Sequence, residues 1–330
     1  MIIKYIIAIL LFSAIILFHE LGHFLLAKAN GIRVNEFSLG LGPTIVGFTK
    51  GETKYSIKLL PFGGACMMEG EDSQSDDDRS FQKKSVWARI SVVAAGPIFN
   101  FIMAFVLAVI ILGNIGISTP TVAQVEDGYG AQTAGLQAGD EIIKMNHKHI
   151  HFFKEISMYT LFHAGETVEV TYERNGERHI VEVQPTYDEE QGRYRYGIDG
   201  SGEYTKVGPI KTLQYSVYEV KYWIQYTVGS LKMLLTRQVS VNDLSGPVGI
   251  VKTIGDTYDM SKSDGAFYVW MNLLPIPALD GGRLVFLVIE AIRGKRVSED
   301  KEGMVHFIGL LCLFGLMILI MFNDIRKLIP

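Results

Sequence analysis

Long apolar stretches alternate with polar segments along this chain. Three of them are about long enough to cross a membrane as a helix of roughly 20 residues. They run from about Tyr5 to Lys28, from Val92 to Leu112 and from Met304 to Phe322. No small-x-small cleavage site follows the first stretch, so we expect a retained transmembrane helix there rather than a signal peptide.

The segment between the first two stretches has a strand-like pattern. Polar and apolar residues alternate in "TKYSIKLLPF", and turn-forming residues occupy Thr49–Glu52, which predicts a β-hairpin over about 34–65. The acidic run "EDSQSDDDRS" follows. We interpret this run as a solvated linker rather than a calcium site, because it has no ladder of ligands with a glycine turn.

A polar insert separates the second apolar stretch from the rest of the chain. Short alternating segments in 114–203 predict several strands, and "ERNGER" is typical of a tight hairpin turn. The following segment, Ile210 to Leu235, has the pattern of an amphipathic helix. Its tyrosines and tryptophan are residues that favour the membrane interface.

The composition agrees with a membrane protein that carries a polar domain. Hydrophobic residues make up 48% of the chain and charged residues 20%, with a formal net charge of −4. No basic stripe with interleaved aromatic residues is present, so we expect no nucleic-acid partner. Cys66 and Cys312 lie far apart in the sequence, and we expect no structural disulfide. Lysines and arginines gather in 30–90, which predicts a cytoplasmic location for this segment and an extracytoplasmic location for the insert.

The motif "HELGH" lies near the end of the first apolar stretch. His19 and His23 are four residues apart and therefore share one face of a helix. Two imidazoles at this spacing can supply two ligands of a tetrahedral zinc site, and Glu20 can act as general base. The alternative is a pair of surface histidines. A transmembrane setting disfavours this alternative, because an unpartnered carboxylate at membrane depth is costly.

A catalytic zinc ion has three protein ligands as a rule, so a third ligand is expected from another membrane-embedded segment. Asp280 lies within the apolar segment "NLLPIPALDGGRLVFLVIEAI", which prolines and glycines interrupt. It is the candidate third ligand; the alternative is a helix-capping aspartate in a kinked helix. A second histidine cluster, His147, His149 and His151, is interpreted as surface residues rather than as another metal site.

These motifs together resemble the site-2 intramembrane metalloproteases, and most closely the bacterial regulator-of-sigma-E type. The resemblance rests on "HELGH", on "GPIFN" in the second apolar stretch, on "LDG" near the C-terminus and on "AGLQAGDEIIKMN" and "LSGPVGI", and it extends over nearly the whole chain. It implies one zinc ion per chain, held by His19, His23 and Asp280, with Glu20 as the catalytic base. It also implies that Asn272, Gly96, Pro97 and Asn100 shape the substrate-binding site.

The resemblance also implies a function. The expected activity is hydrolysis of a peptide bond in or near the transmembrane segment of single-span membrane proteins, such as anti-sigma factors and remnant signal peptides. An upstream site-1 type protease would trim these substrates first, and the insert would be a PDZ domain that filters them by size. The hairpin would pair with an extended substrate by strand addition. The expected location is the bacterial cytoplasmic membrane, with membrane lipid as the surrounding partner.

One departure from this family concerns the third of its four expected spans. The apolar run before Asn272 is only Ala266 to Met271, about a dozen residues short of the length needed for a span. Three interpretations stay open: one kinked segment that includes the aspartate motif, a truncated form that assembles the zinc site poorly, or residues omitted from this sequence. The alternative function is therefore a catalytically impaired or non-catalytic PDZ membrane adaptor.

The expected fold is a polytopic α-helical membrane protein with a membrane-associated β-hairpin region and a mixed α/β PDZ domain between spans 2 and 3. The expected order is 1–29 first span with the histidine motif, 30–90 cytoplasmic-side hairpin and loop, 91–113 second span, 114–203 PDZ domain, 204–255 amphipathic helical region, 256–293 shortened third span, and 294–330 loop and fourth span.

Overall fold

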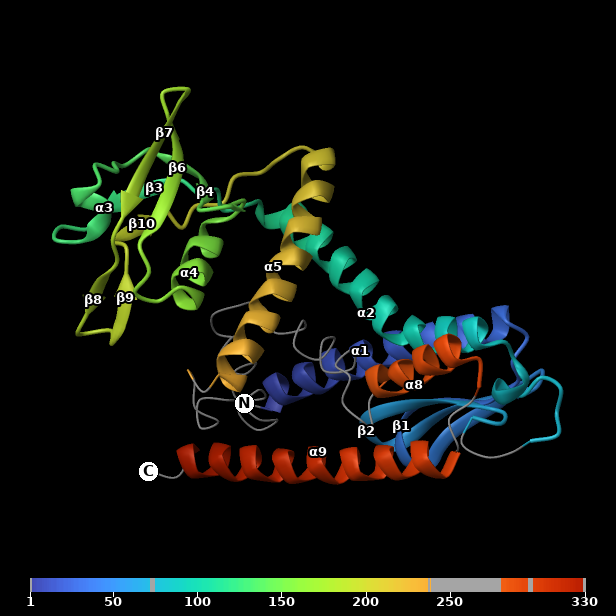
Figure 1. The fold of residues 1–330 in the computed structure, drawn as a ribbon. Coiled ribbons are helices and arrows are strands. Elements are labelled where there is room, and N and C mark those ends of the chain that lie inside the picture. Colours follow the sequence, from blue (N-terminus) through green and yellow to red (C-terminus); the bar gives the residue numbers. More distant parts are fainter. Residues whose placement is uncertain (1, 72–74, 237, 239–279, 296–298, 329–330) are drawn as a thin grey trace. The chain divides into compact units, whose positions relative to one another are not determined.

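A computed structural model describes residues 2–71, 75–236, 238, 280–295 and 299–328 of the chain (Figure 1). The chain divides into two compact units. The first contains Met1–Ala104 and Val239–Pro330, and the second contains Phe105–Gln238. Asn272, the 244–250 motif and the predicted shortened approach to Asp280 lie outside the described residues.

The first unit combines long helices with a long β-hairpin. Its described elements are α1 (Ile2–Ala29), β1 (Val34–Lys50), β2 (Thr53–Met68), the 3-10 helix η1 (Phe81–Lys83), the first part of α2 (Val86–Ile115), α8 (Asp280–Arg293) and α9 (Glu299–Leu328). Their buried side chains form one apolar cluster, made of Ala27, Ile32, Val34, Cys66, Met68, Phe81, Val92, Val93 and Leu287. The three apolar stretches of the sequence thus lie within α1, α2 and α9 (Figure 1).

The β-hairpin folds back on itself. Residues 36–39 of β1 pair on one side with 54–57 of β2 and on the other side with 64–67 of the same strand. Gly40 and Gly63, with φ of 90° and 87°, lie where the chain bends. A Cβ atom at Gly40 would lie 2.4 Å from the Leu60 carbonyl oxygen, so a glycine is required there. The segment 64–68 consequently forms an outer edge of this small sheet, and the predicted hairpin is present.

Helices α1 and α2 approach each other closely at a glycine. A Cβ atom at Gly22 would lie 2.4 Å from the Ala95 carbonyl oxygen and 3.0 Å from the Phe99 ring. Small residues at such positions allow backbones to approach in membrane helix pairs, where apolar lipid competes with apolar side chains. This contact aligns the histidine-bearing turn of α1 with the middle of α2.

Two ion pairs connect α8 to the rest of the first unit. Arg89 of α2 pairs with Glu290 of α8, and both side chains are largely buried, with exposed fractions of 7% and 14%. Arg283 of α8 pairs with Glu71, which follows strand β2. Charged pairs removed from water hold a specific geometry, because separating them leaves buried charges uncompensated. The helix that begins at Asp280 is therefore fixed to α2 and to the hairpin.

The second unit contains the polar insert and the helix that follows it. Its strands and helices after α2 are β3 (Val122–Val125), α3 (Gly130–Thr133), β4 (Glu141–Met145), β5 (Lys148–His149), α4 (Phe153–Phe162), β6 (Val168–Arg174), β7 (Glu177–Val183), β8 (Thr186–Asp188), β9 (Arg193–Arg195), β10 (Ile198–Gly200) and α5 (Pro209–Leu235). The sheet order is β5-β4-β6-β7, with β10-β3 and β8-β9 as separate pairs. The predicted "ERNGER" turn joins β6 to β7, and its central residues Asn175 and Gly176 both have positive φ.

Helix α5 buries small polar and aromatic residues and exposes aliphatic ones. Its buried residues are mostly small and polar or aromatic, namely Thr212, Ser216, Tyr222 and Thr227. Its exposed residues include the aliphatic side chains Ile210, Leu213, Val217, Val228 and Leu235. Lys154 of α4 pairs with Glu219 at 2.5 Å and lies 4.4 Å from the Tyr222 ring centroid, which fixes the polar face against the insert. The predicted amphipathic helix is present, with its aliphatic side exposed.

Among the described helices, α2 is the one whose length and apolar composition suffice to cross a membrane. The prediction of four spans therefore stays a prediction, as do the domain boundaries.

Candidate metal centre

The two histidines of the "HELGH" motif lie in the last part of α1 and face the same side. Their ring centroids are 4.9 Å apart in an edge-to-face arrangement, and their Nε2 atoms are 3.2 Å apart. Both side chains are largely buried, with exposed fractions of 10% and 11%. The helical repeat of 3.6 residues places positions four apart above each other, so the predicted shared face is present.

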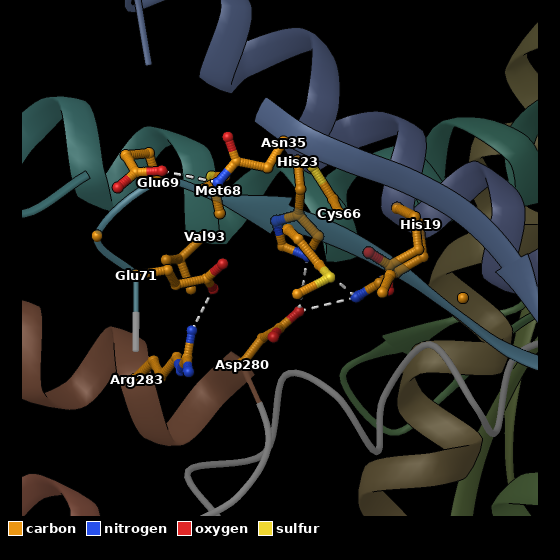
Figure 2. A pocket seen from close by; sticks show the side chains of 15 residues that line it. His19, His23, Asn35, Cys66, Met68, Glu69, Glu71, Val93, Asp280 and Arg283 are labelled. Carbon is orange, nitrogen blue, oxygen red and sulfur yellow. Dashed lines mark hydrogen bonds and ion pairs between the residues drawn. The ribbon is translucent and has the colours of Figure 1, made fainter. Parts of the chain in front are cut away.

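Asp280, the first residue of α8, meets this pair. Its Oδ2 atom lies 2.8 Å from His19 Nε2 and 3.2 Å from His23 Nε2 (Figure 2). All three donor atoms lie within 4.8 Å of one another. Among the residues that the structure describes, His19, His23 and Asp280 are the one group of three whose donor atoms could hold a metal ion. The sequence-predicted ligands are therefore brought together.

The donor set is suited to zinc. Two imidazole nitrogens and one carboxylate oxygen match the three protein ligands of a catalytic zinc site, which leaves a fourth position open. Zinc bonds of about 2.0–2.1 Å imply ligand atoms about 3.3 Å apart at the corners of a tetrahedron. The observed separations of 2.8, 3.2 and 3.2 Å are shorter than that value by up to about half an ångström. The residues present therefore fit the ion with only a small expansion.

The Nδ1 atom of each imidazole ring, on the side away from Asp280, also has a hydrogen-bond partner. His23 Nδ1 donates a hydrogen bond of 2.8 Å to the Val92 carbonyl oxygen of α2. The side-chain amide of Asn100 lies 3.1 Å from His19 Nδ1. Partners on the second ring nitrogen fix the orientation and the tautomer of metal-binding histidines. Helix α2 thus positions both histidines.

Gly96 provides the space for the two rings. A Cβ atom at this position would lie 2.3 Å from His23 Nε2 and 2.7 Å from His19 Cε1. Real Cβ atoms do not approach other heavy atoms so closely, so any larger residue would displace the rings. Gly96 and Asn100 therefore act on the ligands themselves. Pro97 lies inside α2, and Asn272 lies outside the described residues.

A pocket of about 430 Å³ opens beside the three candidate ligands. Its wall on one side is the outer segment of β2, from Gly64 to Met68, and Arg283 closes another side with its partner Glu71 (Figure 2). The residues that line it are His19, Glu20, His23, Asn35, Gly64, Ala65, Cys66, Met67, Met68, Glu69, Gly70, Glu71, Val93, Asp280 and Arg283. The pocket therefore lies between the candidate ligands and a strand edge.

Glu20 connects the ligand helix to this strand edge. The Cys66 backbone N–H donates a hydrogen bond to its carboxylate. A Cβ atom on Gly64 would lie 3.0 Å from Glu20 Cγ, so the strand and the glutamate are in close contact. The Cys66 N–H therefore points toward Glu20. Sequence reasoning did not single out Gly64, Val92, Glu71 or Arg283, because their roles depend on contacts between distant segments.

The second histidine cluster has the character of a surface segment. His149 is exposed, and His151 stacks on Tyr218 with ring centroids 3.8 Å apart. Its Nδ1 atom lies 3.4 Å from Glu155, and burial lowers the pKa of His151. Among the described residues, these histidines do not belong to a group whose donor atoms could hold one metal ion together.

Comparison with known proteins gives a consistent assignment. The model of peptidase family M50 matches residues 7–316. The zinc metalloprotease RasP of Geobacillus kaustophilus is 32% identical, covering 97% of both chains, and the regulator of sigma-W protease RasP of Bacillus subtilis is 30% identical, again covering 97% of both chains.

Solved PDZ domains of SdrC-like proteins also align with part of the chain. The domain from Listeria monocytogenes is 23% identical, with a TM-score of 0.23, and covers 24% of this chain and 85% of its own. The domain from Listeria innocua is 24% identical, with a TM-score of 0.22, and covers 27% of this chain and 97% of its own. These scores are too low to support a structural argument. The family match extends over most of the sequence: the chain belongs to peptidase family M50, which confirms the metalloprotease class and the zinc cofactor expected from its motifs.

Proposed function

We propose that this chain cleaves peptide bonds in or near the transmembrane segments of single-span membrane proteins. The observation that carries the proposal is the convergence of His19, His23 and Asp280 beside a strand edge, with Glu20 lining the same pocket and bonded to the Cys66 N–H of that edge. His19, His23 and Asp280 are the proposed zinc ligands. Held there, the ion would supply Lewis-acid chemistry: it would polarise the scissile carbonyl and make water acidic enough to react near pH 7.

Glu20 is the proposed proton carrier. Its carboxylate lines the pocket next to the two histidines, where it can take a proton from the attacking water and transfer it to the leaving amine. The Cys66 N–H restrains the carboxylate from the opposite side. The chain's own contribution is therefore to hold the base and the three ligands in one fixed arrangement around the reacting bond.

The outer segment of β2 is the proposed substrate-binding edge. A helix resists proteolysis because its carbonyls are already hydrogen-bonded, so the substrate has to unwind before cleavage. An extended segment can then add to Gly64–Met68 as another strand, since main-chain hydrogen bonds give affinity without requiring one particular sequence. This edge lies in the same pocket as the candidate ligands, which supports binding and cleavage at one place.

The surroundings of the site support a location in the membrane. Proteins of family M50 are membrane proteins, and α2 is apolar enough to span a bilayer. Exposed side chains of the hairpin are strongly apolar; they include Leu41, Ile45, Val46, Phe48, Ile57, Leu59 and Leu60. We propose that the hairpin contacts lipid, that the chain forms four spans in the cytoplasmic membrane, and that 114–203 is an extracytoplasmic PDZ domain.

The proposed substrate class is that of anti-sigma factors and remnant signal peptides. Its support is the similarity to the regulator of sigma-W protease RasP of Bacillus subtilis, whose name refers to a sigma factor. Such substrates are proposed to be trimmed first by a site-1 type protease, with the PDZ domain as a size filter.

The decisive experiment compares zinc content and cleavage in the full chain purified in detergent. We expect one zinc ion per chain and cleavage of a single-span model substrate. We expect Glu20→Gln to retain zinc and to lose cleavage, and Glu203→Gln, at an exposed position, to retain both. A folded protein without zinc would contradict the proposal. Normal zinc binding with no cleavage of any single-span substrate would instead favour the adaptor alternative.

A further inference from the structure

Asn100 is one of the most deeply buried polar residues of the first unit, with 1% of its surface exposed. Its amide nitrogen Nδ2 lies 3.1 Å from His19 Nδ1. Its amide oxygen Oδ1 is buried and has no hydrogen-bond partner in the structure. A buried amide oxygen without a partner is destabilising, because it has given up its hydrogen bonds to water without replacing them.

The proton on His19 determines which amide atom should face the ring. His19 Nε2 faces Asp280 and His23, so it is the nitrogen available to a metal ion. A neutral imidazole that binds metal through Nε2 keeps its proton on Nδ1, and this N–H then needs an acceptor. An Nδ2 group placed opposite Nδ1–H would set two donors against each other.

A half-turn of the amide removes the donor–donor conflict at His19 and gives Oδ1 a hydrogen-bond partner. It exchanges the amide oxygen and nitrogen, so that Oδ1 takes the position 3.1 Å from Nδ1 and accepts the His19 proton. The oxygen and nitrogen of an amide have nearly the same size, and the hydrogen-bond network decides between the two orientations. The orientation in the structure instead suits the other neutral tautomer of His19, in which Nε2–H donates to Asp280 and Nδ1 accepts from the amide.

We propose that Asn100 is a positioning residue for zinc, not a substrate-binding residue: its amide turns to accept the Nδ1 proton of His19 and thereby holds Nε2 ready for the metal. This inference rests on the proposed zinc ligands and adds a residue that touches neither metal nor substrate. Loss of a hydrogen-bond partner of a metal-binding histidine typically weakens metal binding about 10–100-fold.

The test is the zinc affinity of the full chain, measured by competition with a chelator. Asn100→Leu and Asn100→Ala remove the acceptor, and we expect both to bind zinc about 10–100-fold more weakly. Asn100→Asp has an oxygen on either side of the carboxyl group, so it needs no rotation. We expect its zinc affinity to stay within about threefold of that of the unaltered chain. This change is much smaller than the 10–100-fold loss expected for the other two variants. Asn114→Leu, an exposed asparagine farther along α2 that caps the Ile110 carbonyl, is the matched control with unchanged affinity.

The ranking of the variants by zinc affinity distinguishes a positioning role of Asn100 from a space-filling one. If Asn100 only fills space, the buried charge of Asn100→Asp is at least as harmful as Asn100→Leu, and that result would overturn the inference. Folded Asn100→Leu or Asn100→Ala with unaltered zinc affinity would overturn it as well, and this outcome does not require that Asn100→Asp folds. An unaltered chain that binds no zinc would instead refute the proposed function itself.

Discussion

His23 Nε2 and Asp280 Oδ2 lie 3.2 Å apart, although 257 positions separate these residues in the sequence. The contact depends on two supports. Helix α2 holds the far nitrogen of His23 through the Val92 carbonyl, and it also holds α8 through Arg89 and Glu290. The same helix therefore positions candidate ligands from both ends of the chain.

The Arg89–Glu290 pair is expected to determine whether Asp280 reaches the histidines. Removing one partner of a buried pair typically costs about 3–5 kcal/mol, because the other charge is left uncompensated. We expect Glu290→Met to lower thermal stability in detergent and to reduce zinc content. The double variant Arg89→Met with Glu290→Met removes both charges and is expected to recover part of both properties. If the double variant loses as much thermal stability and zinc as Arg89→Met and Glu290→Met lose together, the pair has no such role.

Gly96→Ala is expected to disrupt the metal site without removing any ligand. The new Cβ atom would lie 2.3 Å from His23 Nε2, so the imidazole rings have to move. A displacement of about 1 Å at a catalytic centre can lower the rate about a hundredfold. We expect cleavage to fall by about this factor, together with zinc content. Gly303→Ala, on α9, where the new Cβ meets no atom within 4 Å, is the control and should be unaffected.

Gly64→Ala is expected to separate base positioning from metal binding. Its Cβ atom would lie 3.0 Å from Glu20 Cγ, which displaces the carboxylate by only a few tenths of an ångström. We expect cleavage of a single-span substrate to fall roughly tenfold, less than for a displacement of 1 Å, with zinc content retained. Loss of zinc in this variant would mean that the strand edge supports the ligands rather than the base.

Asp188 is expected to give the second unit an acid-sensitive contribution to stability. The Gln191 backbone N–H, together with Tyr129 and Arg195, holds the pKa of Asp188 below its usual value. A lowered pKa means that the carboxylate stabilises the folded state above about pH 4, the value of an unfolded aspartate. This contribution is lost as the pH falls through the lower folded pKa.

The measurement is thermal unfolding of the full chain in detergent, followed by circular dichroism at pH 6 and pH 3. We expect Asp188→Asn to unfold at a lower temperature than the unaltered chain at pH 6, with a smaller difference at pH 3. Glu189→Gln, the exposed neighbour, should show no difference at either pH. An equal effect of Asp188→Asn at both values would exclude the acid-sensitive contribution.

Local patterns in the sequence determined much of this protein. The spacing of His19 and His23 placed two ligands on one helical face, because that relation depends only on the helical repeat. Alternation and turn residues predicted the hairpin of β1 and β2 and the turn at Asn175–Gly176, since these too are local. The motif around Asp280 marked it as the candidate third ligand.

The tertiary structure decided how distant segments support the site. The contact of Asn100 with His19, the space that Gly96 leaves and the position of Glu20 against Cys66 all join residues far apart in the sequence. Alternation predicted strands but not that β2 bends back to present Gly64–Met68 as an edge. Periodicity fixes which residues share a face. Packing between helices and strands decides which other residues that face contacts. The chemistry of this centre depends on those contacts.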